Sequence, residues 1–161
     1  MLRAGHDLPA LPQKEALSEV ASHLLEECRM VLPGIQALFG FQLMAVFNPK
    51  FWGLVESHRV VHLVAIGLVA VAVALVMTPA AYHRLAMRNS VSQSFIDLSS
   101  RLLLCSMFPL LVGICLDFYV ISTMILSDAG WGMALSLALT TVFGSLWFGL
   151  PYLTLTSRTD S

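Results

Sequence analysis

The sequence predicts an all-α integral membrane protein: a bundle of four transmembrane helices preceded by a cytoplasmic amphipathic helix. Of its residues, 57% are hydrophobic and only 12% are charged, whereas about a quarter of a soluble domain is charged. The charges are also unevenly spaced and leave long apolar runs. Because roughly 20 apolar residues of helix cross a bilayer core of about 30 Å, such runs predict spanning segments.

Four segments are long and apolar enough to span a bilayer. They lie at residues 31–48, 58–82, 102–126 and 131–150. The second is the clearest, because between Val60 and Tyr82 it has no Asp, Glu, Lys or Arg. Each segment is expected to be helical, since a backbone amide within lipid needs an internal partner. This membrane domain covers 31–156, with an irregular arm at 1–13 and a short tail at 157–161.

Residues 14–30 predict an amphipathic helix at the cytoplasmic surface. Its apolar residues recur at helical spacing, and those expected to face inward include Leu17, Val20, Leu24 and Cys28. Interfacial helices that bind anionic lipid are rich in Lys and Arg, whereas this segment is net acidic. We therefore expect it to dock on the protein's own cytoplasmic loop or on a partner. Pro33 then allows a bend into the first span.

The basic residues predict the orientation of the bundle. The side with the arm, the middle loop and the tail carries Arg3, Lys14, Arg29, Arg84, Arg88, Arg101 and Arg158, and the other side carries Lys50 and Arg59. By the positive-inside rule, both termini are expected in the cytoplasm. Aromatic and basic residues at the ends of the spans are typical interfacial anchors, and those predicted here are Trp52, Tyr82, His83, Arg84 and Trp131. For His83 and Arg84, contact with a lipid head group or a partner is the alternative.

Asp117 is the most informative single residue, because it lies within the third span. At 1.5 Å per residue it is roughly 8–15 Å inside the outer end of its helix, where a carboxylate costs about 2.5–3.5 kcal/mol. One interpretation is a buried hydrogen bond that fixes helix register, with Gln42 as the first expected partner and His62 as the next. The other interpretation is a proton or cation site, for which Asp117 would line a cavity open to the outer face.

The fourth span carries a helix-packing signal. The small residues Gly132, Ser136, Thr140 and Gly144 repeat every four positions and form a stripe. Lipid offers helices no hydrophobic reason to associate, so close approach at small residues supplies much of the attraction. We expect this stripe to contact another helix, either in the bundle or in another chain. Ala70 and Ala74 form a weaker version on the second span.

Few residues indicate chemistry. The cysteines Cys28, Cys105 and Cys115 are scattered and odd in number, which predicts structural thiols and no metal site. His62 could ligate the metal of a haem or a chlorophyll-type pigment. The other three spans have no histidine, so our first expectation is that the protein has no cofactor. The sequence has no phosphate-binding loop or hydrolytic triad, which predicts a non-enzyme. A net charge of −1 without a basic stripe argues against nucleic acid.

The sequence resembles an uncharacterised family of small bacterial four-helix membrane proteins, a domain of unknown function. The resemblance lies in LLEECRMVLPGIQALFGFQLMAVF and TPAAYHRL, and LWFGLP is compatible with the last helix of that family. It covers roughly residues 24–151 and implies the four-helix topology and a bacterial inner membrane. The family has no established activity, so the resemblance implies no functional residues.

The expected function is that of a non-catalytic accessory or scaffold subunit of a larger membrane complex. Such a subunit would contact the lipid bilayer and either other membrane subunits or further copies of itself. One alternative is a small transporter or channel with Asp117 as its ion-sensitive group. Another is a pigment- or haem-binding membrane subunit that uses His62.

Overall fold

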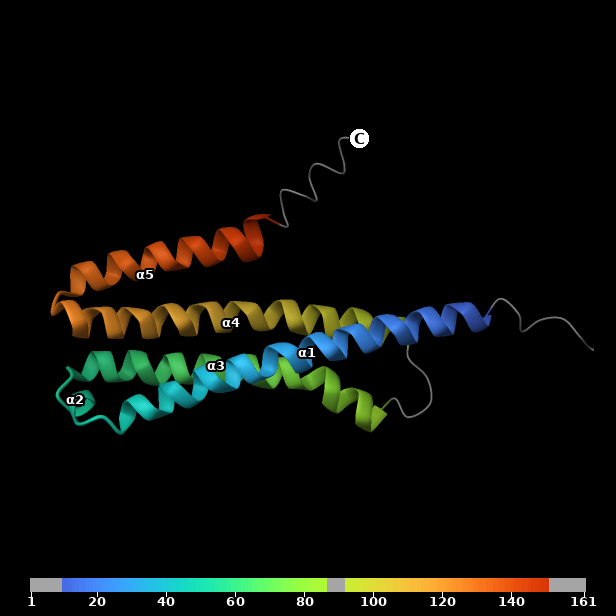
Figure 1. Cartoon of the computed structure of the whole chain (residues 1–161), viewed down its shortest axis with the longest axis horizontal. Coiled ribbons are helices and arrows are strands. Elements are labelled where there is room, and N and C mark those ends of the chain that lie inside the picture. The colour runs from blue at the N-terminus through green and yellow to red at the C-terminus, as the bar shows by residue number, and fades with distance from the viewer. Residues whose placement is uncertain (1–9, 87–91, 151–161) are drawn as a thin grey trace, which may run out of the picture.

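The computed structural model describes residues 10–86 and 92–150, with side chains described for residues 17–85 and 92–150. Within these ranges the regular structure is entirely helical, which confirms the all-α prediction. The elements are α1 (Ala10–Val46), α2 (Pro49–Trp52), α3 (Glu56–Ala86), α4 (Gln93–Leu126), α5 (Ala129–Gly144) and a π-helical turn, η1 (Ser145–Gly149). The long helices run alternately in opposite directions (Figure 1).

Helices α3 and α4 form the centre of the bundle and lie side by side (Figure 1). Helix α1 crosses α3 obliquely and also contacts α4, while α5 packs against α4 on the side away from α3. We name the two ends of the bundle for their contents. The α2 end holds α2 and the turn between α4 and α5, and the Arg84 end is where α3 ends and α4 begins.

Four helical segments are long and apolar enough to cross a membrane. They are Leu17–Val46, Glu56–Leu85, Gln93–Leu126 and Ala129–Gly149. They correspond to the four predicted spans, and the first three extend further toward the Arg84 end than the charge-free runs indicated. The extension amounts to two or more turns of helix for the first and third spans and to less than one turn for the second.

The structure differs from the prediction in α1. Residues 14–30 are not a separate helix along the surface, because α1 continues through Pro33 to Val46 as one element. Residues on both sides of the proline, Cys28 and Ile35, are buried in the same core cluster with α3. Pro33 has no backbone N–H to donate within the helix. The shared packing on both sides of Pro33 nevertheless keeps α1 continuous.

The central core lies between α1 and α3. Cys28 and Ile35 pack with Val69 and Val76, and partly buried residues such as Leu38 complete the cluster. On α3 the small residues that are fully buried are Ala65 and Ala72. Ala70 and Ala74, the predicted small-residue positions on this helix, are exposed instead, because they lie on a different face of α3.

A second cluster closes the Arg84 end. Ala21, Phe95 and Ile96 are buried there, and Leu17 and Leu24 pack against them. The predicted inward positions of Leu17 and Leu24 are thus confirmed, but Val20 is 46% exposed. The next residue, Ala21, takes the inward position because each residue turns the helix by about 100°.

Short polar caps set the turns between the helices. Ser92 accepts a hydrogen bond from the Phe95 amide at 3.3 Å at the start of α4. Asp128 accepts from the Gly130 amide at 2.7 Å at the start of α5. Asn48 and Pro49 begin α2, with the Asn48 side chain accepting from the Lys50 amide. Such caps satisfy amide donors that the first turn of a helix leaves free.

Candidate functional site

Asp117 is buried inside the bundle. It is 7% exposed and lies on α4, where Gly113 and Val120, about one turn away on either side, are also buried. This face of α4 is turned toward α1 and α3, as the hydrogen bonds of the carboxyl group show. The one acidic side chain of the third predicted span is therefore kept within the protein.

Gln42 of α1 and His62 of α3 both contact the Asp117 carboxyl group. Gln42 Nε2 donates to Oδ2 at 2.5 Å, and His62 Nδ1 lies 2.8 Å from Oδ1. The other ring nitrogen of His62, Nε2, lies 3.0 Å from the backbone oxygen of Gln42. We call these three residues the buried polar triad. The two hydrogen-bond partners predicted for Asp117 are thus confirmed.

The two ring nitrogens of His62 face different oxygen acceptors. Nε2 faces a backbone oxygen, which only accepts hydrogen bonds, and Nδ1 faces the carboxyl group of Asp117. Each oxygen of the Asp117 carboxyl group thus has a polar partner, one from α1 and one from α3. Such partners reduce the cost of burying the carboxyl group.

The short helix α2 covers one side of the triad. Its Phe51 is buried, and the Phe51 ring meets the His62 ring edge-on with centroids 5.2 Å apart. One turn before His62 on α3, His58 Nε2 lies 3.4 Å from the Tyr119 hydroxyl of α4. Aromatic rings thus lie at the α2 end above the triad, and one of them, Phe51, contacts the triad itself.

A hollow of about 340 Å³ at the α2 end also reaches the triad. His62 lines it together with Trp52, Glu56 and Arg59. Arg59 lies over the Trp52 ring, 6.0 Å from its centroid. Asp117 and Gln42 are not among the lining residues of this hollow. Access from this side therefore leads to the His62 ring and not directly to the carboxyl group.

The geometry restricts what metal or pigment could bind. Among the residues that the structure describes, no group of three or more His, Cys, Asp and Glu side chains is placed to hold a metal ion. Both ring nitrogens of His62 already face oxygen atoms. A haem or a pigment bound through His62 would have to replace one of these two contacts.

The predicted anchors lie at both ends of the bundle. Trp52 and Trp131 are 63% and 65% exposed at the α2 end. At the Arg84 end, the rings of Tyr82 and His83 each lie 5.8 Å from the Phe95 ring. Arg84 is exposed. Two of the anchors at this end thus also join α3 to the start of α4.

The small-residue stripe of α5 is used mainly at its start. A side chain on Gly132 would collide with Thr123 of α4, and Ser136 Oγ donates to the backbone oxygen of Cys115 at 2.7 Å. Thr140 bonds within its own helix, to the Ser136 oxygen. No atom lies within 4 Å of where a Gly144 side chain would begin. The stripe therefore contacts α4 at its first half and leaves it at the second.

Two residues near the site, Gly113 and Phe51, were not predicted from the sequence. Gly113 lets α3 and α4 approach, since a Cβ there would lie 2.9 Å from Val69 Cγ2 and 3.1 Å from the Ala65 oxygen. Phe51, which covers His62, sits on a single helical turn that hydropathy does not detect. The pair Asn48 and Pro49 was the available signal, because Asn at a cap and Pro in the first turn are typical of helix starts.

Four apolar helices are long enough to cross a bilayer, and Gln42, His62 and Asp117 are buried between three of them. This arrangement is typical of a multi-pass membrane protein. The chain belongs to a family of unknown function, DUF6328, whose family model matches residues 12–151. This match confirms the resemblance seen in the sequence. No curated protein and no solved structure matches the chain.

Proposed function

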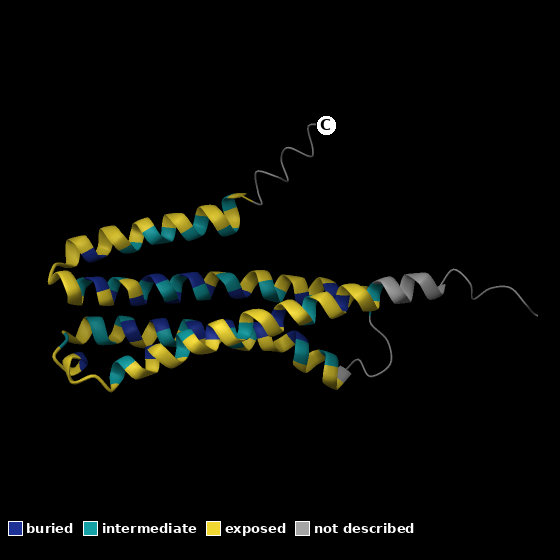
Figure 2. Cartoon of the chain, viewed as in Figure 1, coloured by how far each residue is buried: buried dark blue, intermediate teal, exposed yellow. Residues whose placement is uncertain are grey.

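We propose that this protein is a non-catalytic accessory or scaffold subunit of a larger complex in the bacterial inner membrane. The observation that carries the proposal is the exposure of the two outer helices. In the most apolar stretch of α5 and η1 only 6% of the residues are buried, and in that of α1 only 11%, against 39% for α4. Figure 2 shows exposed residues along much of α1 and α5. Much of both helices is thus left for lipid or for another protein.

The exposed face of α5 favours another protein. Ala134, Ala138, Thr141 and Ser145 are exposed and recur at helical spacing, opposite the stripe that contacts α4. A lipid-facing helix has no need of small residues, whereas close helix–helix approach does. We infer that α5 lies between α4 and a helix of a partner subunit or of a second copy.

The test is purification from native membranes in a mild detergent, with Ala138→Phe and Leu146→Phe compared with the unchanged chain. Both positions are exposed, but at about 100° per residue Leu146 lies to one side of the small-residue face on which Ala138 lies. We expect a second subunit, of another protein or of this chain, to co-purify with the unchanged chain and with Leu146→Phe, and to be lost from Ala138→Phe. A chain that always purifies as a monomer without a partner would overturn the proposal.

One contact favours a second function, a small transporter or channel with Asp117 as its ion-sensitive group. The hollow at the α2 end reaches His62, whose Nδ1 lies 2.8 Å from Asp117 Oδ1. Gln42 Oε1 is also buried without a hydrogen-bond partner among the described residues, so it offers a free acceptor beside the pair. In this case Asp117→Asn would change proton or cation flux in reconstituted liposomes. Unchanged flux in a stably folded variant would remove this candidate.

A further inference from the structure

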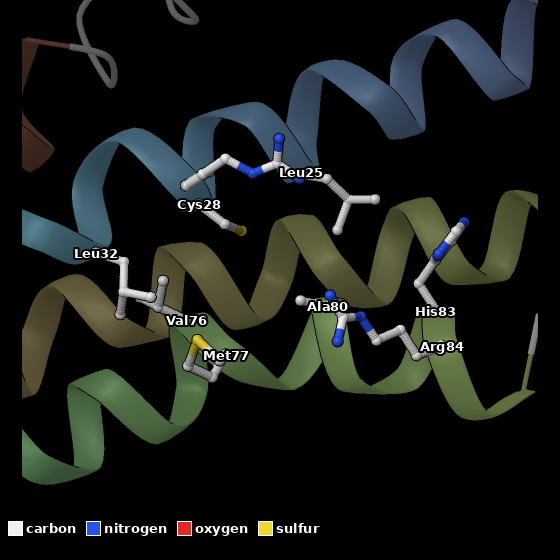
Figure 3. A pocket seen from close by; sticks show the side chains of 9 residues that line it. Leu25, Cys28, Leu32, Val76, Met77, Ala80, His83 and Arg84 are labelled. Atoms are coloured by element: carbon white, nitrogen blue, oxygen red, sulfur yellow. The ribbon is translucent and has the colours of Figure 1, made fainter.

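A groove at the Arg84 end lies between α1 and α3. It has a volume of about 360 Å³, and Figure 3 shows the side chains that line it. Three basic side chains line it, Arg29 from α1 with His83 and Arg84 from α3. The rest of its wall is largely apolar and includes Leu32, Val76 and Met77. The groove therefore combines positive charge with an apolar surface.

The charge and the apolar wall lie at different depths. On α3, Val76 precedes His83 by about two turns, which places it roughly 10 Å further from the Arg84 end. On α1, which runs in the opposite direction, Leu32 lies about one turn deeper than Arg29. In a membrane the groove would be basic near the surface and apolar toward the bilayer centre.

The arginines of the groove are available to an outside ligand. The ion pair found among the described residues is that of His62 and Asp117, so neither Arg29 nor Arg84 is paired with a described carboxylate. Glu27 lines a different hollow, between α1 and α4. Glu27 is thus directed away from the groove, while Arg29 lines it.

We propose that this groove binds an anionic phospholipid, with its phosphate held by Arg29 and Arg84 and an acyl chain along Leu32, Val76 and Met77. Basic pockets between membrane helices on the cytoplasmic side bind acidic lipid head groups, and guanidinium groups form strong charge-assisted bonds with phosphate. A free phosphate would leave the apolar wall without a partner. The inference rests on the membrane placement of the bundle, not on a partner subunit.

The experiment uses the purified full chain in detergent, stripped of lipid. Phosphatidylglycerol and phosphatidylcholine with identical acyl chains are added separately, and binding is measured by native mass spectrometry and by the shift in melting temperature. We expect phosphatidylglycerol to bind and to stabilise the chain more than phosphatidylcholine. In the double variant Arg29→Gln and Arg84→Gln, affinity for phosphatidylglycerol should fall by about tenfold or more, since each Arg contributes about 1 kcal/mol near an anionic surface.

Two controls separate the groove from general charge effects. Arg101→Gln removes an exposed arginine of α4 that does not line the groove, so its affinity for phosphatidylglycerol should stay unchanged. Ala80→Leu fills the groove, which Ala80 lines, without changing a charge, and should also weaken binding. Circular dichroism and gel filtration identify variants that remain folded.

Three results would overturn the proposal. The first is equal binding of the two lipids, and the second is unchanged affinity in a folded double variant. The third is inorganic phosphate that stabilises the chain as much as phosphatidylglycerol at equal concentration, because the apolar wall would then contribute nothing.

Discussion

At the scale of single residues, the buried polar triad joins three helices through one carboxyl group. Asp117 on α4 contacts Gln42 on α1 and His62 on α3, and His62 returns a contact to the backbone of α1. Sliding any of these helices by one residue would separate the groups by about 1.5 Å along the axis. The triad therefore fixes the relative heights of α1, α3 and α4 in a largely apolar interior.

The first prediction concerns Gln42. Gln42→Leu removes the amide that donates to Asp117 Oδ2, and we expect the free energy of unfolding to fall by about 1–2 kcal/mol, the value of an interhelical hydrogen bond in membranes. The measurement is denaturant unfolding of the purified chain in detergent micelles. Gln36→Leu is the control, because Gln36 is exposed on the same helix and should change stability little. Equal effects of the two substitutions would show that the contact contributes nothing.

Sequence reasoning could find the triad but not all of its surroundings. Asp117, Gln42 and His62 stand out because a polar side chain in a long apolar run is costly unless it has a partner. Their similar depths in the predicted spans, counted along the helices, then indicate that the three side chains can be in contact. Phe51 could not be found in this way. It lies over His62 because of the direction of the short helix α2, and the sequence does not reveal this direction.

At the scale of the helices, hydropathy located the spans but not their true lengths. The first three spans continue toward the Arg84 end through segments that carry charge, and these segments are helical because they pack on one another. The cluster of Ala21, Phe95 and Ile96 is an example. The predicted break in α1 at Pro33 is wrong. A proline removes one local hydrogen bond, which the sequence shows. The core contacts on both sides of Pro33 depend on the whole bundle, which the sequence does not show.

The second prediction concerns the start of α5. A Cβ on Gly132 would collide with Thr123 Oγ1 and lie 3.2 Å and 3.3 Å from the Thr123 backbone nitrogen and Cα. Because backbone atoms cannot move aside cheaply, Gly132→Ala should destabilise the packing of α5 on α4 by about 1–3 kcal/mol. Gly144→Ala, with open space around it, should be neutral or slightly stabilising.

Thermal unfolding in detergent and hydrogen exchange of the α5 amides would both measure this difference. We expect faster exchange in α5 of Gly132→Ala and no change in Gly144→Ala. If the two variants behaved alike, the small-residue stripe would not be what holds α5 against α4.

At the scale of the whole molecule, burial falls from the centre to the outside. The pair of α3 and α4 carries the tightest contacts, whereas α1 and α5 cover it from two sides and expose most of their own surface (Figure 2). The polar triad, the hollow at His62 and the exposed tryptophans Trp52 and Trp131 lie toward the α2 end. The groove with Arg29 and Arg84 lies at the other end. The two ends of the bundle thus carry chemically different surfaces.

The last prediction is the orientation of these two ends. Among the Lys and Arg side chains that the structure describes, Arg29, Arg84 and Arg101 lie toward the Arg84 end, and Lys50 and Arg59 lie at the α2 end. In the topology predicted from the sequence, the rest of the chain on the side of the arm and the tail brings the count there to seven of nine. The positive-inside rule then places the Arg84 end in the cytoplasm.

The test replaces the three native cysteines by alanine and introduces Ser57→Cys at the α2 end or Ser94→Cys at the Arg84 end, both at exposed positions. In intact cells whose outer membrane lets the reagent reach the periplasm, a maleimide that cannot cross the inner membrane should label Ser57→Cys. It should label Ser94→Cys only after that membrane is permeabilised. The cysteine-free chain should stay unlabelled, and the reverse pattern would place the groove of Arg29 and Arg84 on the outer face.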